Sequence, residues 1–229
     1  MTDKMGPLEQ SLVNALVNNG VRVKTINVRD EGLTNMDARA VLLINDVVKS
    51  LVISSLFPKT LNPLKTYQMA LNRVTLYNEL RHSGIPTPKY QVALEPNVVA
   101  KVIKEMYRAY LATPSMSLEL DGIVTSWEGG KSIAEHRVYL GNPLVSINMV
   151  MPAPEKIQTH LVVGGECLDC GDNGELIKEV AKVTGCYYCR VSLGYYGGEP
   201  TVLGIDPRIE LRQEHLDKFI NTVMRWLNE

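Results

Sequence analysis

The stretch that decides the fold is NRVTLYNELRHSGIPTPKY, residues 72–90. Residues 74–82 are a helix-like run that stops at Gly84, the residue type that most easily takes the left-handed conformation closing a helix. The prolines of the following Ile-Pro-Thr-Pro keep the residues before them out of the helical region, so the chain continues in an extended path. We therefore predict a helix over 64–82 and a strand over 89–94.

Toward the N-terminus, the pattern alternates between helix and strand. Leucines and valines at helical spacing predict a helix over 8–19, which an Asn-Gly pair ends. Residues 21–28 alternate apolar and polar side chains as a strand does, and 40–44 form a short apolar run typical of a buried parallel strand. This order predicts a small α/β lobe over residues 1–63.

Toward the C-terminus, short strands and helices follow one another. Pro96 suits the first turn of a helix, and Gly129-Gly130 indicates a turn between strands. The expected helices are 97–107, 175–184 and 214–227, and the expected strands are 108–112, 118–127, 137–139, 144–150, 157–163, 186–193 and 201–205. The chain is thus predicted to be α+β, or mixed α/β, with lobes 1–63, 64–150 and 151–229 and a ligand cleft between lobes.

Composition and charge exclude several classes of function. The 229 residues carry a formal net charge of -1 and a pI near 6.4, which gives no field for nucleic acid or an anionic membrane. No apolar run reaches the roughly 18 residues that a bilayer-spanning helix needs, and the first residues have no signal-peptide pattern. We expect a soluble, cytoplasmic protein that binds neither nucleic acid nor membrane.

Five segments, taken in order along the chain, resemble those of a known family. They are LVNNGVRVKTINV (16–28), GIPTPK (84–89), PAPEKIQTHLVVGGE (152–166), ELIKEVAKVTGC (175–186) and TVLGIDPRIEL (201–211). Together they resemble the ATP-grasp carboxylate–amine ligases, and most closely the RimK/LysX-like branch. The resemblance implies two lobes that clamp ATP, magnesium that bridges the phosphates, and an acyl phosphate that an amine attacks.

Where this family has its phosphate and adenine contacts, the chain carries other residues. Arg73 and Thr113 take the places of two lysines, and Ser115-Met116-Ser117-Leu118 replaces a glycine-rich loop. Ile147-Asn148 stands in the hinge that meets adenine, and Gln158 replaces an arginine. A backbone that approaches phosphate closely favours glycine, and a lost lysine removes a charge, so this set predicts weak nucleotide contacts.

The positions where the family has its magnesium ligands also carry other residues. Arg190 stands where the resemblance places an aspartate, Gly204 where it places a glutamate, and Asp206 where it places an asparagine. A positive or absent side chain does not hold a divalent cation. These positions predict a shell of the fold whose ATP and magnesium site has been lost.

Two functions follow from the resemblance. The first is a non-catalytic binding or scaffold protein that pairs with itself or with an active paralogous ligase. The second is an ATP-dependent carboxylate–amine ligase with atypical ligands. For the second, the nucleotide contacts would be Lys65, Arg73, Lys131 and Asn148, and the magnesium ligands Asp206, Glu210 and Glu199. The C-terminal helix, with Phe219, Val223 and Trp226 at helical spacing, would either form an interface or pack on its own core.

The four cysteines form two C-x2-C pairs separated by fifteen residues, Cys167 with Cys170 and Cys186 with Cys189. This spacing fits zinc sites, and the glycine after Cys170 permits a tight knuckle. The second pair lies in a predicted strand, where side chains three residues apart point to opposite faces. A zinc ion held by all four, disulfides, and buried free thiols all remain open. A structural zinc would replace stability lost with the ligand site.

Three other polar clusters have plainer explanations. SWEGGKS, residues 126–132, contains glycines and a lysine but lacks Walker spacing, so we predict a hairpin turn. Glu135-His136-Arg137 is predicted to be an exposed strand end, and His160 a histidine within a core strand. Asp206 and Glu210, beside Pro207, are more typical of a capped turn than of a metal site.

Overall fold

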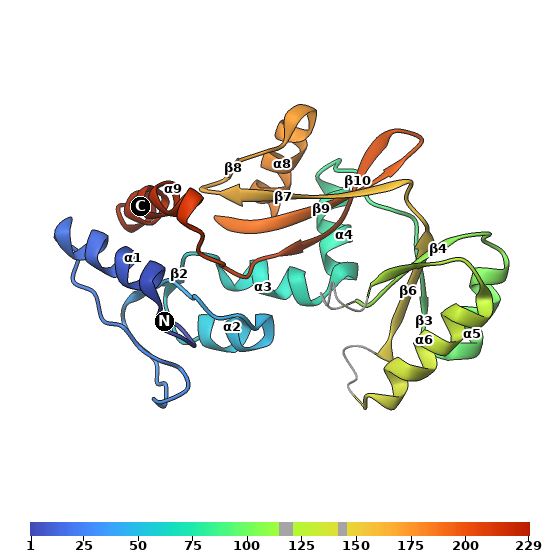
Figure 1. Ribbon diagram of the computed structural model, residues 1–229, viewed down its shortest axis with the longest axis horizontal. Coiled ribbons are helices and arrows are strands. Elements are labelled where there is room, and N and C mark those ends of the chain that lie inside the picture. Colours follow the sequence, from blue (N-terminus) through green and yellow to red (C-terminus); the bar gives the residue numbers. More distant parts are fainter. Residues whose placement is uncertain (115–120, 142–145) are drawn as a thin grey trace. The chain divides into compact units, whose positions relative to one another are not determined.

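The structure is a computed structural model of the chain that describes residues 1–114, 121–141 and 146–229 (Figure 1). Its helices and largely antiparallel sheets confirm the predicted α+β class. The chain groups into two compact units. Unit 1 contains Met1–Gln68, His160–Val191 and Asp206–Glu229, and unit 2 contains Met69–Thr159 and Ser192–Ile205. The division into three lobes stays a prediction.

Within the stretch 72–90, the structure from Arg73 onward is as predicted. Helix α4 (Arg73–His82) ends before Gly84, whose φ is +75°, and strand β3 (Gln91–Ala93) follows the prolines. The single helix predicted over 64–82 is wrong, because α3 (Leu64–Leu71) stops before Asn72. The Asn72 side chain accepts a hydrogen bond from the Thr75 amide at 3.2 Å and so begins a new helix.

Unit 2 contains a four-stranded antiparallel sheet in the order β3-β6-β4-β5. Its other strands are β4 (Ala109–Ala112), β5 (Gly122–Val124) and β6 (Asn148–Pro152). Helices α5 (Pro96–Lys104) and α6 (Trp127–Tyr139) lie side by side against it (Figure 1). Apolar side chains from both helices and from the strands form one buried cluster, so this sheet and its helices share a core.

The glycine pair at 129–130 lies inside α6, so the predicted hairpin turn and the predicted strand over 137–139 are wrong. Ser126 caps this helix and accepts from the Gly129 amide at 3.1 Å. A Cβ on Gly130 would lie 2.1 Å from Cδ1 of Ile103 on α5. Glycine is therefore present because the two helices pack closely, and a turn is not needed to explain it.

A second four-stranded sheet has the order β10-β9-β7-β8. Its strands are β7 (Lys156–Val163), β8 (Glu166–Cys167), β9 (Tyr188–Tyr196) and β10 (Glu199–Asp206). Helix α8 (Gly174–Thr184) contacts β8 and follows the short 3-10 helix η2 (Gly171–Asn173). The strands predicted over 157–163, 186–193 and 201–205 are therefore present, with shifted ends.

The C-terminal helix α9 (Leu216–Leu227) follows the 3-10 helix η3 (Gln213–His215) and contacts α1 (Pro7–Asn18). Phe219, Val223 and Trp226 are buried in the core cluster of unit 1. Two roles were open for this helix, an interface or packing on the chain's own core. In the structure its apolar face packs on the chain's own core.

The N-terminal part of unit 1 has little regular sheet. Strands β1 (Arg39–Ala40) and β2 (Lys59–Thr60) pair in parallel, and α2 (Val47–Ser54) lies between them in sequence. The strand predicted over 21–28 is wrong, because this run pairs only through an isolated bridge from Asn27 to Thr2. A partner segment of one residue cannot support a ladder.

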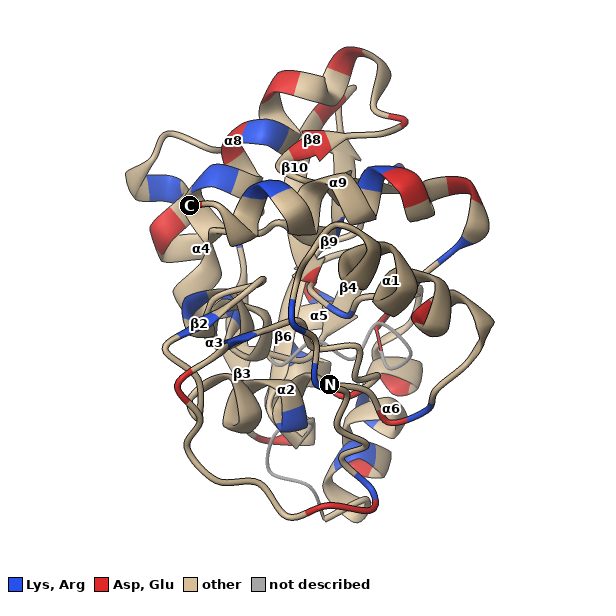
Figure 2. Ribbon diagram, turned by 90° about the vertical axis from the view of Figure 1, so that its left-hand side faces the viewer, with Lys and Arg blue, Asp and Glu red and all other residues tan. Residues whose placement is uncertain are grey.

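Lysine and arginine positions are interspersed with aspartate and glutamate positions along α8 and α9 (Figure 2). This mixing agrees with the near-neutral net charge of -1. In the parts of the chain that the structure describes, no helix combines the length and apolar character needed to cross a bilayer.

Candidate functional site

Two of the three acidic residues predicted as magnesium ligands, Asp206 and Glu210, meet around one guanidinium. Arg190, on β9, donates from Nη2 to Asp206 Oδ2 at 2.7 Å. The same side chain donates from Nη1 to Glu210 Oε2 at 3.1 Å and from Nη2 to Glu210 Oε1 at 3.2 Å. Asp206 ends β10 and its side chain is 1% exposed. Arg190 therefore lies between the two carboxylates.

A second arginine engages Asp206 from the other side. Arg208 donates from Nε to Oδ1 at 2.9 Å and from Nη2 to Oδ2 at 2.8 Å, and its amide donates to Oδ1 at 3.1 Å. Burial raises the pKa of Asp206, but the hydrogen bonds and charge of Arg208, with the charge of Arg190, outweigh burial and hold this pKa below its ordinary value. Asp206 is thus a buried, ionised carboxylate with both oxygens occupied.

This arrangement does not fit a divalent cation. Magnesium prefers carboxylate and water oxygens in octahedral geometry. Here two guanidinium groups lie against Asp206, and one of them also binds Glu210. The four side chains balance their charges without a metal, and an added cation would be repelled by both arginines.

Arg73, a predicted phosphate contact, is buried with a carboxylate partner. It is the first residue of α4, and its Nη2 lies 2.5 Å from Asp121 Oδ2, with both side chains 1% exposed. Its Nη1 donates to the Thr113 carbonyl at 3.0 Å, and the Thr113 amide donates to Asp121 Oδ1 at 3.1 Å. Burial lowers the pKa of Arg73 and the charge of Asp121 raises it, with a net increase.

Asn148, the predicted adenine contact, is also buried with an arginine. Its Oδ1 accepts from Arg137 Nη1 at 2.7 Å, and its Nδ2 donates to the Ser146 carbonyl at 3.0 Å. Arg137 donates further to the Ala112 carbonyl at 3.1 Å and is 1% exposed. The exposed strand end predicted for Glu135-His136-Arg137 is therefore wrong, because Arg137 is on the inner face of helix α6.

The two predicted lysine contacts lie in separate units. Lys131 forms an exposed ion pair with Glu135 on α6, with 3.7 Å between Nζ and Oε1. Lys65, on α3, belongs to unit 1 and lines a cavity of about 550 Å³ there. Neither observation assigns a phosphate contact. The predicted glycine-loop replacement, residues 115–118, lies outside the described residues.

Two other cavities lie within single units. In unit 1, a cavity of about 410 Å³ is lined mostly by apolar side chains of the N-terminal segment together with Val223 and Trp226. In unit 2, a cavity of about 490 Å³ is lined by both apolar and polar residues, among them Ile133, Asp121 and His136. The second cavity borders the buried ion pair of Arg73.

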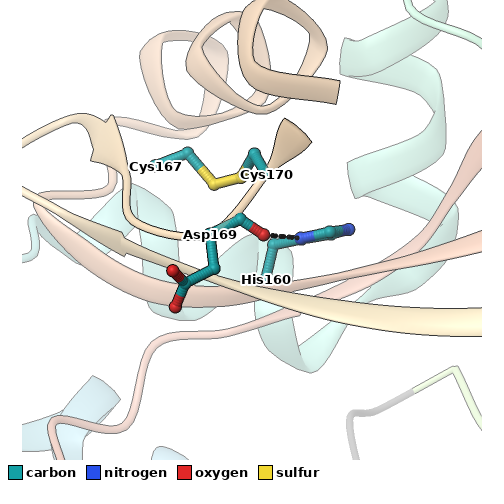
Figure 3. The surroundings of a disulfide bond; sticks show 4 residues. All are labelled: His160, Cys167, Asp169 and Cys170. Atoms are coloured by element: carbon teal, nitrogen blue, oxygen red, sulfur yellow. Dashed lines mark hydrogen bonds between the residues drawn. A yellow bond between two sulfur atoms is a disulfide. The ribbon is translucent and has the colours of Figure 1, made fainter. Parts of the chain in front are cut away.

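The four cysteines do not converge on one site. Cys167 and Cys170 form a disulfide (Figure 3). Cys186 and Cys189 are buried free thiols. In the ranges 1–114, 121–141 and 146–229, one metal-type group is brought together, and it consists of Cys167, Cys170 and His160. Sequence reasoning placed this histidine in a core strand and did not connect it to the cysteines.

Asp121 is another residue that sequence reasoning missed. It neutralises Arg73, and Tyr110 also donates to it at 3.4 Å. The signal in the sequence was weak, because Asp121 falls within the strand predicted over 118–127 and no local pattern there links it to Arg73. Only the fold brings this carboxylate to the start of α4.

No protein-family model matches the chain. It is 22% identical over 219 residues to a glutamate–LysW ligase, ArgX, of Sulfurisphaera tokodaii, covering 88% of this chain and 73% of that protein. It is 23% identical over 176 residues to ArgX of Sulfolobus acidocaldarius, covering 71% of this chain and 62% of that protein.

Solved structures share the whole fold. A RimK-domain ATP-grasp protein from Sphaerobacter thermophilus aligns with a TM-score of 0.78 at 16% identity and covers 98% of both chains. A D-alanine–D-alanine ligase from Bacillus anthracis, complexed with ATP, aligns with a TM-score of 0.66 at 15% identity and covers 98% of this chain and 96% of that one. These likenesses establish the fold.

Proposed function

Because the chain has the ATP-grasp fold, we propose that it is a non-catalytic binding or scaffold protein in which arginine side chains take the place of magnesium. The observation that carries the proposal is the contact of Arg190 with both Asp206 and Glu210. Arg190 stands at a position where a magnesium site needs an acid, and its guanidinium already pairs with Asp206 and Glu210.

The energetic argument is a competition between metal and guanidinium. To bind a divalent ion, Asp206 would have to release Arg190 and Arg208, both of which are partly buried against it. Removing one partner of a buried ion pair costs about 3–5 kcal/mol. Magnesium also loses its hydration shell reluctantly, so the exchange has no compensating gain.

The residues predicted to contact the nucleotide support the same proposal. Arg73 pairs with Asp121, and Asn148 binds Arg137, each in a buried setting. Turning either side chain toward a phosphate or an adenine ring would leave a charged or polar partner buried without compensation. Both residues therefore act as structural supports of unit 2.

The direct experiment is calorimetric titration of the purified chain with ATP and Mg²⁺, with ADP release assayed in parallel. We expect no heat of binding at millimolar nucleotide and no ADP. The informative variant is Arg190→Asp, which restores an acid at the magnesium position and should gain divalent-cation binding. Arg212→Asp is the matched control, because Arg212 is an exposed partner of Glu214 and should gain nothing.

A partner follows from a scaffold role, either a second copy of the chain or an active ligase of the same fold. Sedimentation of the purified chain over a concentration series tests the first. Co-purification with an active relative expressed in the same cells tests the second. A chain that stays monomeric and captures no ligase would contradict the scaffold role without restoring catalysis.

The second candidate is an active ATP-dependent carboxylate–amine ligase. The observation that favours it is the similarity to the two ArgX ligases, which extends over 88% of this chain in one case. Its nucleotide contacts would include Lys65, Arg73 and Lys131, and its metal ligands would be Asp206, Glu210 and Glu199. Micromolar ATP binding with ADP release that depends on an added carboxylate and amine would establish this function.

A further inference from the structure

We propose that His160, Cys167 and Cys170 form a binding site for one thiophilic divalent cation such as Zn²⁺, available when the Cys167–Cys170 disulfide is reduced and closed when it is formed. The proposal rests on the hairpin of β7 and β8, and it does not depend on whether Arg190 takes the place of magnesium. It differs from a four-cysteine site, because the third ligand is a histidine from the neighbouring strand.

The hairpin register brings the histidine to the cysteines. Val162 pairs with Cys167 and Val163 with Glu166, and the Leu168 amide donates to the Leu161 carbonyl at 3.0 Å. One step further along this ladder, the His160 ring meets the Asp169 carbonyl, with 2.9 Å between Nδ1 and that oxygen. Asp169 lies between the two cysteines in sequence, so the ring comes next to the pair (Figure 3).

The distances suit a metal with sulfur and nitrogen ligands. The candidate ligand atoms of His160, Cys167 and Cys170 all lie within 4.8 Å of one another. Tetrahedral zinc has bonds of about 2.3 Å to sulfur and about 2.0 Å to nitrogen, which places its ligand atoms roughly 3.5 Å apart. Binding would therefore require the ligand atoms to move closer together.

The backbone between the cysteines is shaped like a metal knuckle. The two Cα atoms are 5.9 Å apart across a C-x2-C spacing. Gly171, directly after Cys170, has a φ of +49°, a conformation that glycine adopts without strain. The same backbone therefore serves a disulfide or a pair of thiolate ligands, and switching between them needs no rearrangement of the hairpin.

The histidine has hydrogen-bonding capacity that the protein does not use. His160 is 7% exposed, and its Nε2 has no hydrogen-bond partner among the described residues. A buried nitrogen without a partner is uncommon. In Figure 3 this nitrogen is on the side of the ring away from the sulfurs, so metal binding through Nε2 requires the ring to turn. A buried imidazole beside two sulfurs is a ligand set that zinc accepts.

The disulfide is suited to opening and closing. It joins residues only three apart in sequence, so it restricts the unfolded chain little and adds little stability. A dithiol reductant opens it by thiol–disulfide exchange. Two electrons pass to the Cys167–Cys170 bond, the reductant forms its own disulfide, and its two protons yield two thiols. Binding of Zn²⁺ then releases both thiol protons, because thiolates are the ligands.

The other two cysteines are poorly placed for this role. Cys186 and Cys189 are fully buried and are not part of the ligand group. Burial, together with its contact with Cys189, raises the pKa of the Cys186 thiol well above its ordinary value, which disfavours the thiolate. They provide a matched control within the same chain.

The test uses the full chain, reduced with a phosphine, desalted without oxygen and titrated with Zn²⁺ against a chromophoric chelator. We expect one zinc per reduced chain and none after reoxidation to the disulfide. Cys167→Ser and Cys170→Ser should abolish binding, and His160→Ala should weaken it by at least about tenfold. Cys186→Ser and Cys189→Ser should bind as the unaltered chain does.

Cobalt substitution gives a second measurement on the unaltered chain, which removes any dependence on the folding of variants. The proposal predicts charge-transfer and ligand-field bands of a tetrahedral site with two thiolates. Bands of a four-thiolate site, equal loss of zinc in Cys186→Ser, or equal zinc binding by the oxidised chain would each overturn the proposal. So would a reduced chain that binds no zinc.

Discussion

The Arg190 guanidinium lies 2.7 Å from the Asp206 carboxylate, on the neighbouring strand of the same sheet. In the ATP-grasp resemblance these two positions carry magnesium ligands, and here they bind each other. Arg190 also pairs with Glu210, so one guanidinium joins both carboxylates.

Asp206→Asn should destabilise the protein by about 3 kcal/mol, because Arg190 and Arg208 lose their shared charged partner in a partly buried site. Urea unfolding at neutral pH measures this free energy. Glu214→Gln is the matched control, since Glu214 is exposed and paired only at the surface, and it should change stability by less than about 0.5 kcal/mol. Equal effects of both variants would show that Asp206 is not held as the structure has it.

The role of Asp206 also predicts how the free energy of unfolding depends on pH. The pKa of Asp206 lies below its ordinary value in the folded chain. A lowered pKa means that the stabilisation is present above the unfolded pKa, about 3.9, and is lost as the pH falls through the folded pKa. The stability difference between the unaltered chain and Asp206→Asn should therefore be constant above about pH 5 and shrink in stronger acid. A difference that grows on acidification would contradict the assigned direction.

The buried pair of Arg73 and Asp121 should couple strongly. Either Arg73→Leu or Asp121→Leu leaves one charge buried and alone, at a cost of about 3–5 kcal/mol. The double variant removes both charges and should cost well below the sum. The exposed pair of Lys131 and Glu135 is the control, with an expected coupling of at most about 0.5 kcal/mol. Additive losses at Arg73 and Asp121 would speak against a direct pair.

Gly130→Ala should cost about 1–3 kcal/mol, because the added Cβ would lie 2.1 Å from Cδ1 of Ile103. Ile103→Val removes that Cδ1 and should rescue most of the loss in the double variant. Gly174→Ala is a suitable control, since nothing lies within 4 Å of its Cβ position. Thermal unfolding of the unaltered chain, Gly130→Ala, the double variant and Gly174→Ala distinguishes a clash between α5 and α6 from a change in helix propensity.

Asn72→Ala should cost about 1 kcal/mol, because α4 loses the side chain that caps its first turn. Asn72→Asp keeps an acceptor and should retain most of the stability. Equilibrium unfolding of the two variants provides the comparison. Equal losses would mean that the cap contributes little and that α3 and α4 separate for another reason.

The sequence was sufficient where local chemistry alone decides the structure. Gly84 and the two following prolines end one helix and release the chain into β3, as predicted from their backbone preferences. The C-terminal helix was visible from its apolar spacing. At the candidate site, the sequence places a base at Arg190 where the resemblance has an aspartate, and the loss of the metal site stays a prediction.

The sequence was insufficient where distant packing decides the structure. Gly129-Gly130 has the chemistry of a turn, but the close approach of Ile103 explains its place inside a helix. The partnership of Arg73 with Asp121 spans residues far apart in the chain, and no local pattern announces it. The group of His160 with the cysteine pair depends on a hairpin register, which a motif search by cysteine spacing alone does not contain.

The most direct test of whether arginine has replaced magnesium is a crystal structure determined in the presence of millimolar ATP and Mn²⁺, with anomalous data collected for manganese. We expect Arg190 still to bridge Asp206 and Glu210, with no manganese peak beside them. A manganese ion coordinated by Asp206 and Glu210, with Arg190 turned aside and the nucleotide phosphates bound to that ion, would contradict this expectation.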